Sequence, residues 1–232
     1  MKLEILHEDN HCLVVNKPAG LLSQGDVTGD LCLVDLVKRD LKVRFQKPGN
    51  VYLGLIHRLD RPVSGLVLLA RTSKAAERLS AQFRLGAVEK TYWAWVEGGE
   101  IADTGELVDF LLKDSFKNFV ETVEPDKGGK EARLSYRVMT RERQKTLLEL
   151  KPRTGRSHQI RVQLASRGWP IQGDIRYGAE RTLRALDGGH RIALHARSLR
   201  FQHPTSREWI EVQSQVPDDW PGRRSDASSG NL

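Results

Sequence analysis

The feature that most constrains the fold is the run of residues 63–70, in which nearly every side chain is aliphatic. Such a run predicts a short strand that is buried on both faces. The segment just before it, His57-Arg58-Leu59-Asp60-Arg61-Pro62, places one carboxylate between two arginines. We therefore expect Asp60 in a loop positioned by a rigid strand, where a catalytic group gains precision. The alternative is a surface turn in which Asp60 pairs with an arginine.

Size and composition favour one globular unit. The chain has 232 residues, of which 39% are hydrophobic and 29% charged, enough for a single well-packed core. We predict one catalytic domain over residues 1–220 and a disordered tail over residues 221–232, which are rich in Gly, Ser, Arg and Asp. Its two cysteines form no disulfide framework and are expected to be buried free thiols. We expect a cytoplasmic monomer with neither a signal peptide nor a membrane span.

The net charge of +7 is concentrated in two stretches. Residues 141–167 carry eight Lys and Arg against two Glu, and residues 176–207 carry seven Arg against one Glu and one Asp. Arginine recognises phosphate well because its planar fork donates two parallel hydrogen bonds. The stretches indicate a nucleic-acid partner, although a solvated basic face that only aids solubility is the alternative.

Local patterns predict several further elements. Residues 73–83 have helical periodicity with Ser73 as a candidate N-cap, and residues 157–165 favour a helix although their alternation also suits a strand. Residues 90–96 alternate as a strand that places Tyr92, Ala94 and Val96 on one face. Residues 103–129 are polar and are expected to be irregular, with a hairpin around residues 113–118.

Taken together, the motifs resemble those of the RluA-type pseudouridine synthases. The resemblance covers residues 3–216, and no single motif would carry it alone. The matching segments, in chain order, are Leu13-Val14-Val15-Asn16-Lys17-Pro18-Ala19-Gly20, His57-Arg58-Leu59-Asp60, Ser64-Gly65-Leu66, Lys90-Thr91-Tyr92, Thr154-Gly155-Arg156-Ser157-His158-Gln159-Ile160-Arg161, Pro170-Ile171-Gln172-Gly173-Asp174, Leu194-His195-Ala196 and His203-Pro204. The resemblance implies an α+β fold with a long mixed, largely antiparallel sheet, flanking helices and a central basic cleft. It also suggests a short member that consists of the catalytic domain.

The implied reaction converts a uridine of ribosomal or transfer RNA to pseudouridine. It breaks the N1–C1′ bond, turns the uracil and joins it again through C5. Breaking a glycosidic bond develops positive charge on the sugar, which a carboxylate can trap or relieve. The resemblance assigns this role to Asp60, either by attack on C1′ or by removal of the C2′ proton. No metal, nucleotide or redox cofactor is needed.

The resemblance assigns two further catalytic residues. Arg161 would pair with Asp60 and orient it, and Tyr92 would lie under the uracil, able to stack and to exchange the C5 proton. Without the motifs, Arg161 would be equally well explained as a solvent-facing or phosphate-binding arginine, and Tyr92 as a core residue. Arg58 would occupy the space left by a flipped base, or simply bind a phosphate.

The remaining predicted substrate-binding residues are His57, Arg156, His158 and Leu194. His57, His158 and His195 could suggest a metal site, but they are scattered and lack ligand spacing, so we predict no metal. Two other functions compete with the synthase. A noncatalytic RNA-binding module would not need Asp60, Tyr92 and Arg161 together, and a glycoside or nucleoside hydrolase would need a second positioned acid.

Overall fold

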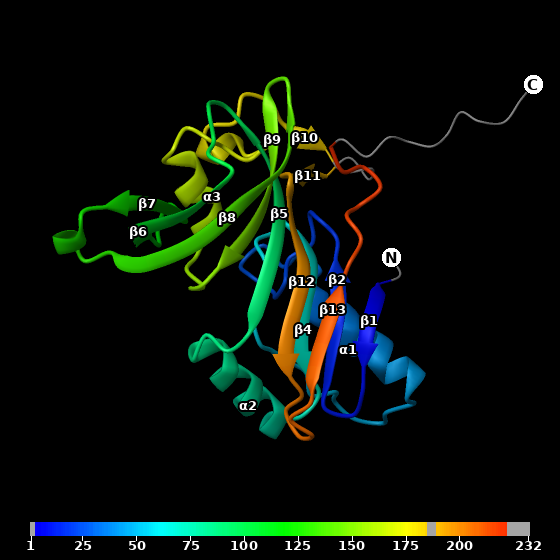
Figure 1. Ribbon diagram of the computed structural model, residues 1–232. Coiled ribbons are helices and arrows are strands. Elements are labelled where there is room, and N and C mark those ends of the chain that lie inside the picture. Colours follow the sequence, from blue (N-terminus) through cyan, green and yellow to red (C-terminus); the bar gives the residue numbers. More distant parts are fainter. Residues whose placement is uncertain (1–2, 185–188, 222–232) are drawn as a thin grey trace, which may run out of the picture.

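A long twisted sheet organises the computed structural model, which describes residues 3–184 and 189–221 (Figure 1). The predicted tail lies outside these residues, apart from its first position. The helices are α1 (Leu33–Arg44), α2 (Ser73–Arg84) and α3 (Gln159–Ala165), with short 3-10 turns at Pro125–Lys127 and Ile175–Tyr177. The strands are β1 (Glu4–Glu8), β2 (Cys12–Lys17), β3 (Gly54–Leu55), β4 (Ser64–Ala70), β5 (Glu89–Glu97), β6 (Thr104–Asp114), β7 (Phe119–Val123), β8 (Lys130–Glu142), β9 (Lys145–Pro152), β10 (Leu183–Arg184), β11 (His190–Arg191), β12 (Leu194–Gln202) and β13 (Trp209–Gln213).

The sheet joins segments from both halves of the chain. Its 11 strands include the path β1-β2-β4-β12-β5-β9-β8-β6-β7, with β13 beside β12 and β3 beside β4. Strands β12 and β4 run parallel, and the other strand pairs found in the described residues run antiparallel. The predicted fold, a mixed and largely antiparallel sheet with flanking helices, is therefore confirmed.

Strand β4 is buried along its whole length, as its aliphatic sequence predicts. Its side chains alternate between two clusters, so that Val67 and Leu69 pack with α1. Leu66 and Leu68 face the opposite side and pack with α2. Helices on both faces of one strand explain why no polar residue interrupts it.

The second half of the sheet differs from the prediction for residues 103–129. The hairpin is present, but most of the segment forms the long strands β6 and β7. Strand β6 has several exposed polar residues and contains Gly105, so its sequence is typical of a loop. A Cβ at Gly105 would lie 2.6 Å from the ring of Tyr136 on β8, so glycine is required for this ring to pack there.

Both predicted helices are present, with one correction at an end. Helix α2 starts at Ser73, but its N-cap is Thr72, whose hydroxyl accepts the backbone N–H of Ala75. Helix α3 is helical rather than extended and presents Ile160 and Leu164 to the main core. Both cysteines are buried and free, as predicted. None of the described helices is long and apolar enough to cross a membrane.

Candidate active site

A pocket of about 750 Å³ gathers all eight predicted site residues. It lies where the loop before β4, the end of α2, strand β5 and the segment leading into α3 meet. The residues from the prediction that line it are His57, Arg58, Asp60, Tyr92, Arg156, His158, Arg161 and Leu194. The structure thus brings together side chains that are up to 137 positions apart (His57 to Leu194) in the sequence.

The position of Asp60 depends on close packing between β4 and β12. Gly65 has φ = +116°, and a Cβ there would lie 2.4 Å from the carbonyl oxygen of Ala196. Only glycine combines this backbone conformation with such a close approach. The short parallel pairing of β4 with β12 therefore fixes where the Asp60 loop enters the sheet.

Buried polar groups hold the backbone of the Asp60 loop in place. The Lys17 side chain is fully buried, and its ammonium donates hydrogen bonds to the carbonyls of Pro18, Leu21 and Arg61 at 2.9, 2.8 and 3.3 Å. Burial lowers the pKa of Lys17 to about 7, and the charge of Asp60 opposes that shift. The backbone on either side of Asp60 is held in a fixed path, because Ser23 also bonds both the N–H and the carbonyl of Leu59.

Arg161 connects Asp60 to a second carboxylate. Its Nη1 lies 3.0 Å from Oδ2 of Asp60, while Nε and Nη2 bind both oxygens of Asp174 at 2.7 and 2.8 Å. Arg161 and Asp174 are 6% and 1% exposed, whereas Asp60 is 26% exposed. Burial disfavours the charged form of Arg161, but the hydrogen bonds and charges of Asp174 and Asp60 raise its pKa. The guanidinium is therefore a fixed cation that leaves the other face of Asp60 open to the pocket.

His158 approaches Asp60 from the start of α3. Its Nδ1 lies 2.8 Å from the hydroxyl of Tyr177, and this hydroxyl accepts the N–H of Val120 at 3.0 Å. The Tyr177 proton is thus available for Nδ1, which favours a ring proton on Nε2, 3.8 Å from Oδ2 of Asp60. His158 adopts φ = +50°, a strained conformation for a side chain of this size. Burial lowers the pKa of His158, and the charges of Asp60 and Asp174 oppose this shift.

Apolar and aromatic groups form the floor of the pocket. Tyr92 lies on β5, and its pKa is raised by burial and by the charge of Asp60, so the phenol stays protonated. Leu194 is 3% exposed and lies on the adjacent strand β12. His57 stacks on Phe83 and accepts the N–H of Leu68 at 3.1 Å, and burial lowers its pKa to about 3. His57 is thus a neutral brace for the wall of the pocket.

The rim of the pocket is cationic. The lining includes six Lys and Arg side chains and one carboxylate, Asp60. The cations are Arg58, Arg84, Lys90, Arg153, Arg156 and Arg161. The first basic stretch, residues 141–167, supplies three of these six cations, whereas residues 176–207 contribute only Leu194 to the described lining.

The sequence analysis missed the groups that support the site from outside the pocket. Asp174 belongs to the matched segment 170–174 and Lys17 to segment 13–20, yet neither received a role. Their signal was a charged residue inside an apolar or turn-forming context, which is unusual unless the charge is paired. Lys90, near the start of β5, and Arg84, at the end of α2, were missed because the local sequence at these positions does not indicate that they border a pocket.

Asp60 is the only carboxylate among the described residues that line the pocket, and no histidine pair there brings metal-ligand geometry. Asp174 is buried and engaged by Arg161 through both oxygens, so it cannot supply a second acid. The site therefore offers one fixed carboxylate, a protonated phenol and a ring of cations. This set suits attack on, or proton removal from, a sugar that carries phosphates.

Comparisons with known proteins agree with this chemistry. A family model described as RNA pseudouridylate synthase matches residues 11–166. Ribosomal large subunit pseudouridine synthase C of Vibrio parahaemolyticus is 35% identical over 213 residues, which are 90% of this chain and 64% of that protein. The tRNA pseudouridine synthase C of Haemophilus ducreyi is 32% identical over 237 residues, covering 95% of this chain and 93% of that protein.

Solved structures give the same result. The human RNA pseudouridylate synthase domain containing 4 protein superposes with a TM-score of 0.75 at 26% identity, over 92% of this chain and 88% of that one. The human domain containing 1 protein gives a TM-score of 0.71 at 25% identity, over 93% and 84%. Because the family model covers more than half of the sequence and the motifs follow the RluA-type order, this chain belongs to the RNA pseudouridylate synthase family.

Proposed function

We propose that the protein isomerises a uridine of ribosomal or transfer RNA to pseudouridine, with Asp60 as the catalytic carboxylate. The observation that carries this proposal is that Asp60, the one carboxylate among the described residues lining the pocket, is held by Arg161 at 3.0 Å with one face open. The chain spans 64% of the length of the Vibrio relative, so the proposal concerns the part of such an enzyme that contains this pocket.

The reaction balances without a cofactor. The N1–C1′ bond breaks, the base turns within the pocket, and a C5–C1′ bond forms. The C5 proton is then lost and N1 regains a proton, so the product has the atoms of the substrate. Asp60 would act beside the ribose, at C1′ or at the C2′ proton, and Arg161 would hold it in a fixed orientation.

The other pocket residues fit defined parts of this reaction. Tyr92 is protonated and lies on the pocket floor, where a phenol can stack against a uracil and assist proton exchange at C5. Arg58 and Arg156 are exposed cations on the rim, suited to the phosphates on either side of the target nucleotide. A uridine must leave its stack to reach Asp60, and Arg58 would then either occupy the space that the base vacates or bind a phosphate.

Two observations disfavour the competing functions. A hydrolase needs a second carboxyl group or an activated water, and Asp174 is unavailable because Arg161 occupies both its oxygens. A binding module has no use for a half-buried carboxylate in a cationic pocket, since it would repel phosphate. The proposal also includes a cytoplasmic, monomeric enzyme, for which two free buried cysteines are suitable.

Product analysis separates the three functions. The protein is incubated with transcribed ribosomal and transfer RNA, which is then digested to nucleosides and examined by mass spectrometry. Pseudouridine with no free uracil supports the synthase, free uracil identifies a hydrolase, and binding without either product identifies a binding module. Pseudouridine maps of cells with and without the gene would then assign the RNA and the position.

A further inference from the structure

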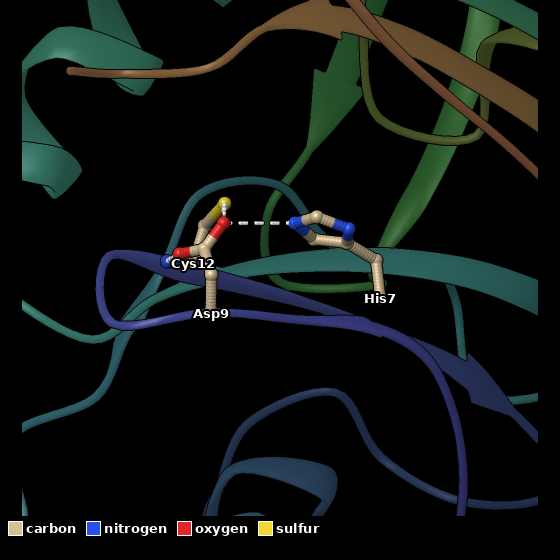
Figure 2. A group of neighbouring side chains, drawn as sticks. All are labelled: His7, Asp9 and Cys12. Atoms are coloured by element: carbon tan, nitrogen blue, oxygen red, sulfur yellow. Dashed lines mark hydrogen bonds and ion pairs between the residues drawn. The ribbon is translucent and has the colours of Figure 1, made fainter. Parts of the chain in front are cut away.

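A second cluster of reactive side chains lies at the opposite end of β2 and β4 from the pocket. His7 lies in β1, Asp9 in the turn that follows it and Cys12 at the start of β2, and their side chains point toward one another (Figure 2). One ligand-type atom from each residue, Nε2, Oδ2 and Sγ, lies within 4.8 Å of the others. The mechanism proposed above uses none of them.

The distances suit a small divalent cation. Oδ2 of Asp9 is 2.9 Å from Nε2 of His7 and 3.6 Å from Sγ of Cys12. Ligands at about 2.0–2.3 Å from a tetrahedral zinc ion are roughly 3.3–3.8 Å apart, so only small movements are needed. Imidazole, carboxylate and thiolate together favour zinc over magnesium or calcium, which prefer oxygen ligands.

Charge and burial also suit a cation of charge +2. Oδ1 of Asp9 accepts the backbone N–H groups of His11 and Cys12 at 2.6 and 2.9 Å, which fixes the carboxylate with Oδ2 directed at His7 and Cys12. Cys12 is completely buried, and its thiol would lose a proton to solvent on binding. Two anionic ligands and one neutral imidazole would then neutralise the ion. His7 and Asp9 are 26% and 31% exposed, which leaves an entry path and a fourth position for water.

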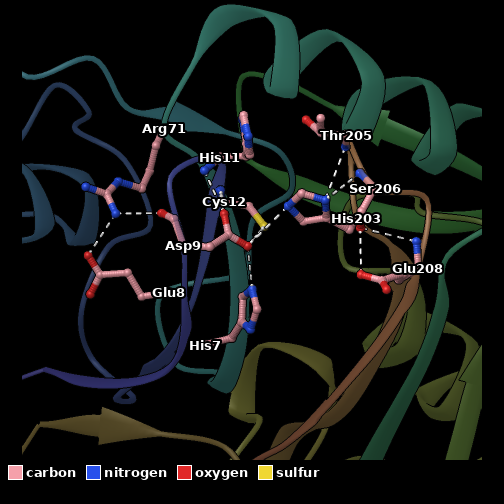
Figure 3. A network of polar contacts seen from close by, with 10 residues as sticks. All are labelled: His7, Glu8, Asp9, His11, Cys12, Arg71, His203, Thr205, Ser206 and Glu208. Atoms are coloured by element: carbon pink, nitrogen blue, oxygen red, sulfur yellow. Dashed lines mark hydrogen bonds and ion pairs between the residues drawn. The ribbon is translucent and has the colours of Figure 1, made fainter.

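The neighbouring His203 supports the cluster but is not a ligand. Its Nδ1 accepts the backbone N–H groups of Thr205 and Ser206 at 3.2 and 2.9 Å, so its proton is on Nε2 (Figure 3). This Nε2 lies 3.2 Å from Oδ2 of Asp9 and donates to it. A donor that holds a ligating carboxylate is the usual outer partner of a metal site.

We propose that His7, Asp9 and Cys12 form a zinc site with His203 as its outer hydrogen-bond donor. Cys12 pairs with Ala70 and Lys17 with Gly65, so five residue steps, about 17 Å, separate the cluster from the pocket end of the strands. The ion would therefore be structural, fastening the β1–β2 turn near the turn that precedes β13. This inference does not depend on the proposed function.

The test is zinc titration of the untagged, chelator-treated full chain by calorimetry, with cobalt as a spectroscopic probe of the sulfur ligand. We expect one zinc per chain and a sulfur-to-cobalt charge-transfer band. His7→Gln and Cys12→Ser should each weaken binding more than about 100-fold, and His203→Gln by roughly 10–100-fold. Binding should also raise the melting temperature of the wild type and not of His7→Gln.

A matched control is available in the second buried cysteine. Cys32 also contacts a carboxylate, Oδ2 of Asp35 at 3.1 Å, and Cys32→Ser should bind zinc as the wild type does. Circular dichroism confirms that each variant is folded, and His7→Gln, which changes a side chain that is 26% exposed, tests the site if Cys12→Ser does not fold. Absence of one-to-one binding in the wild type, or equal binding in His7→Gln and wild type, would overturn the proposal.

Discussion

Replacing Arg161 by methionine should affect stability and catalysis for different reasons. Methionine keeps an unbranched apolar stem, but it is shorter than arginine and loses all three hydrogen bonds to Asp174 and Asp60. Asp174, at 1% exposure, would be left without the partner that binds both its oxygens. Removing one partner of a buried ion pair costs about 3–5 kcal/mol. At about 2–4 °C per kcal/mol for a chain of this size, Tm should fall by roughly 6–20 °C.

The catalytic effect of Arg161→Met should exceed what unfolding explains. Without the 3.0 Å contact, Asp60 is free to leave its reactive orientation. A misplacement of about 1 Å lowers turnover on the order of 100-fold, so we expect at least this loss in a single-turnover assay at saturating RNA. The assay follows tritium release from RNA labelled at C5 of uridine, at a temperature where circular dichroism shows the variant to be native.

Arg156→Met is the matched control for this experiment. Arg156 lines the same pocket but is exposed, and its Nε donates to the backbone carbonyl of Glu131. We expect its Tm to be nearly unchanged and its RNA affinity to fall. If Arg161→Met instead lost RNA affinity while its saturated turnover changed only a few-fold, Arg161 would be a phosphate contact and the orienting role would be refuted.

Three further predictions follow from single features. Gly65→Ala should lower the free energy of unfolding, measured in urea, by about 2–6 kcal/mol, because the alanine would have a strained φ and would clash with the backbone of β12. Gly99→Ala, with open space around the added Cβ, should change this free energy very little, and equal effects of the two variants would contradict the packing argument. Burial lowers the pKa of His195 to about 3, so between pH 6.5 and 3 the unfolded chain binds one more proton than the folded chain, and stability should fall as the pH decreases. His195→Gln should reduce the slope of unfolding free energy against pH by about 1.4 kcal/mol per pH unit in this window. An unchanged slope would mean that His195 is not the group responsible. Arg153→Gln should weaken RNA binding and reduce the slope of log K against log salt, measured by fluorescence anisotropy, by about 0.7. Arg39→Gln, at an exposed residue outside the pocket, should leave both unchanged. If the two variants gave the same slope, the cations on the pocket rim would not be the ones that bind RNA phosphates.

The sequence predicted best those elements that have the same environment on both faces. The residues of β4 are aliphatic on both faces because helices cover both, and this pattern can be read without a structure. The eight site residues were placed together by the order of their motifs. Neither composition nor periodicity could have shown that Tyr92 and Arg161 face Asp60, because strand pairing and the loop before α3 bring them there.

Other features depend on contacts that the sequence does not encode locally. Strand β6 has exposed alternate residues and a glycine covered by Tyr136, so its pattern is that of a loop until β8 is placed beside it. Asp174 becomes significant only when a turn 13 residues beyond Arg161 returns it to that guanidinium. The His7 cluster is completed by a turn almost 200 residues later, which no local pattern reveals.

The central claim, that Asp60 performs the chemistry, is tested most directly by Asp60→Asn. The amide keeps the size of the side chain and removes the charge used at the ribose. In the tritium-release assay on RNA carrying the target uridine, the account predicts no turnover above background together with nearly wild-type RNA affinity. Substantial pseudouridine formation by this variant would contradict the assignment of Asp60, whatever the pocket geometry.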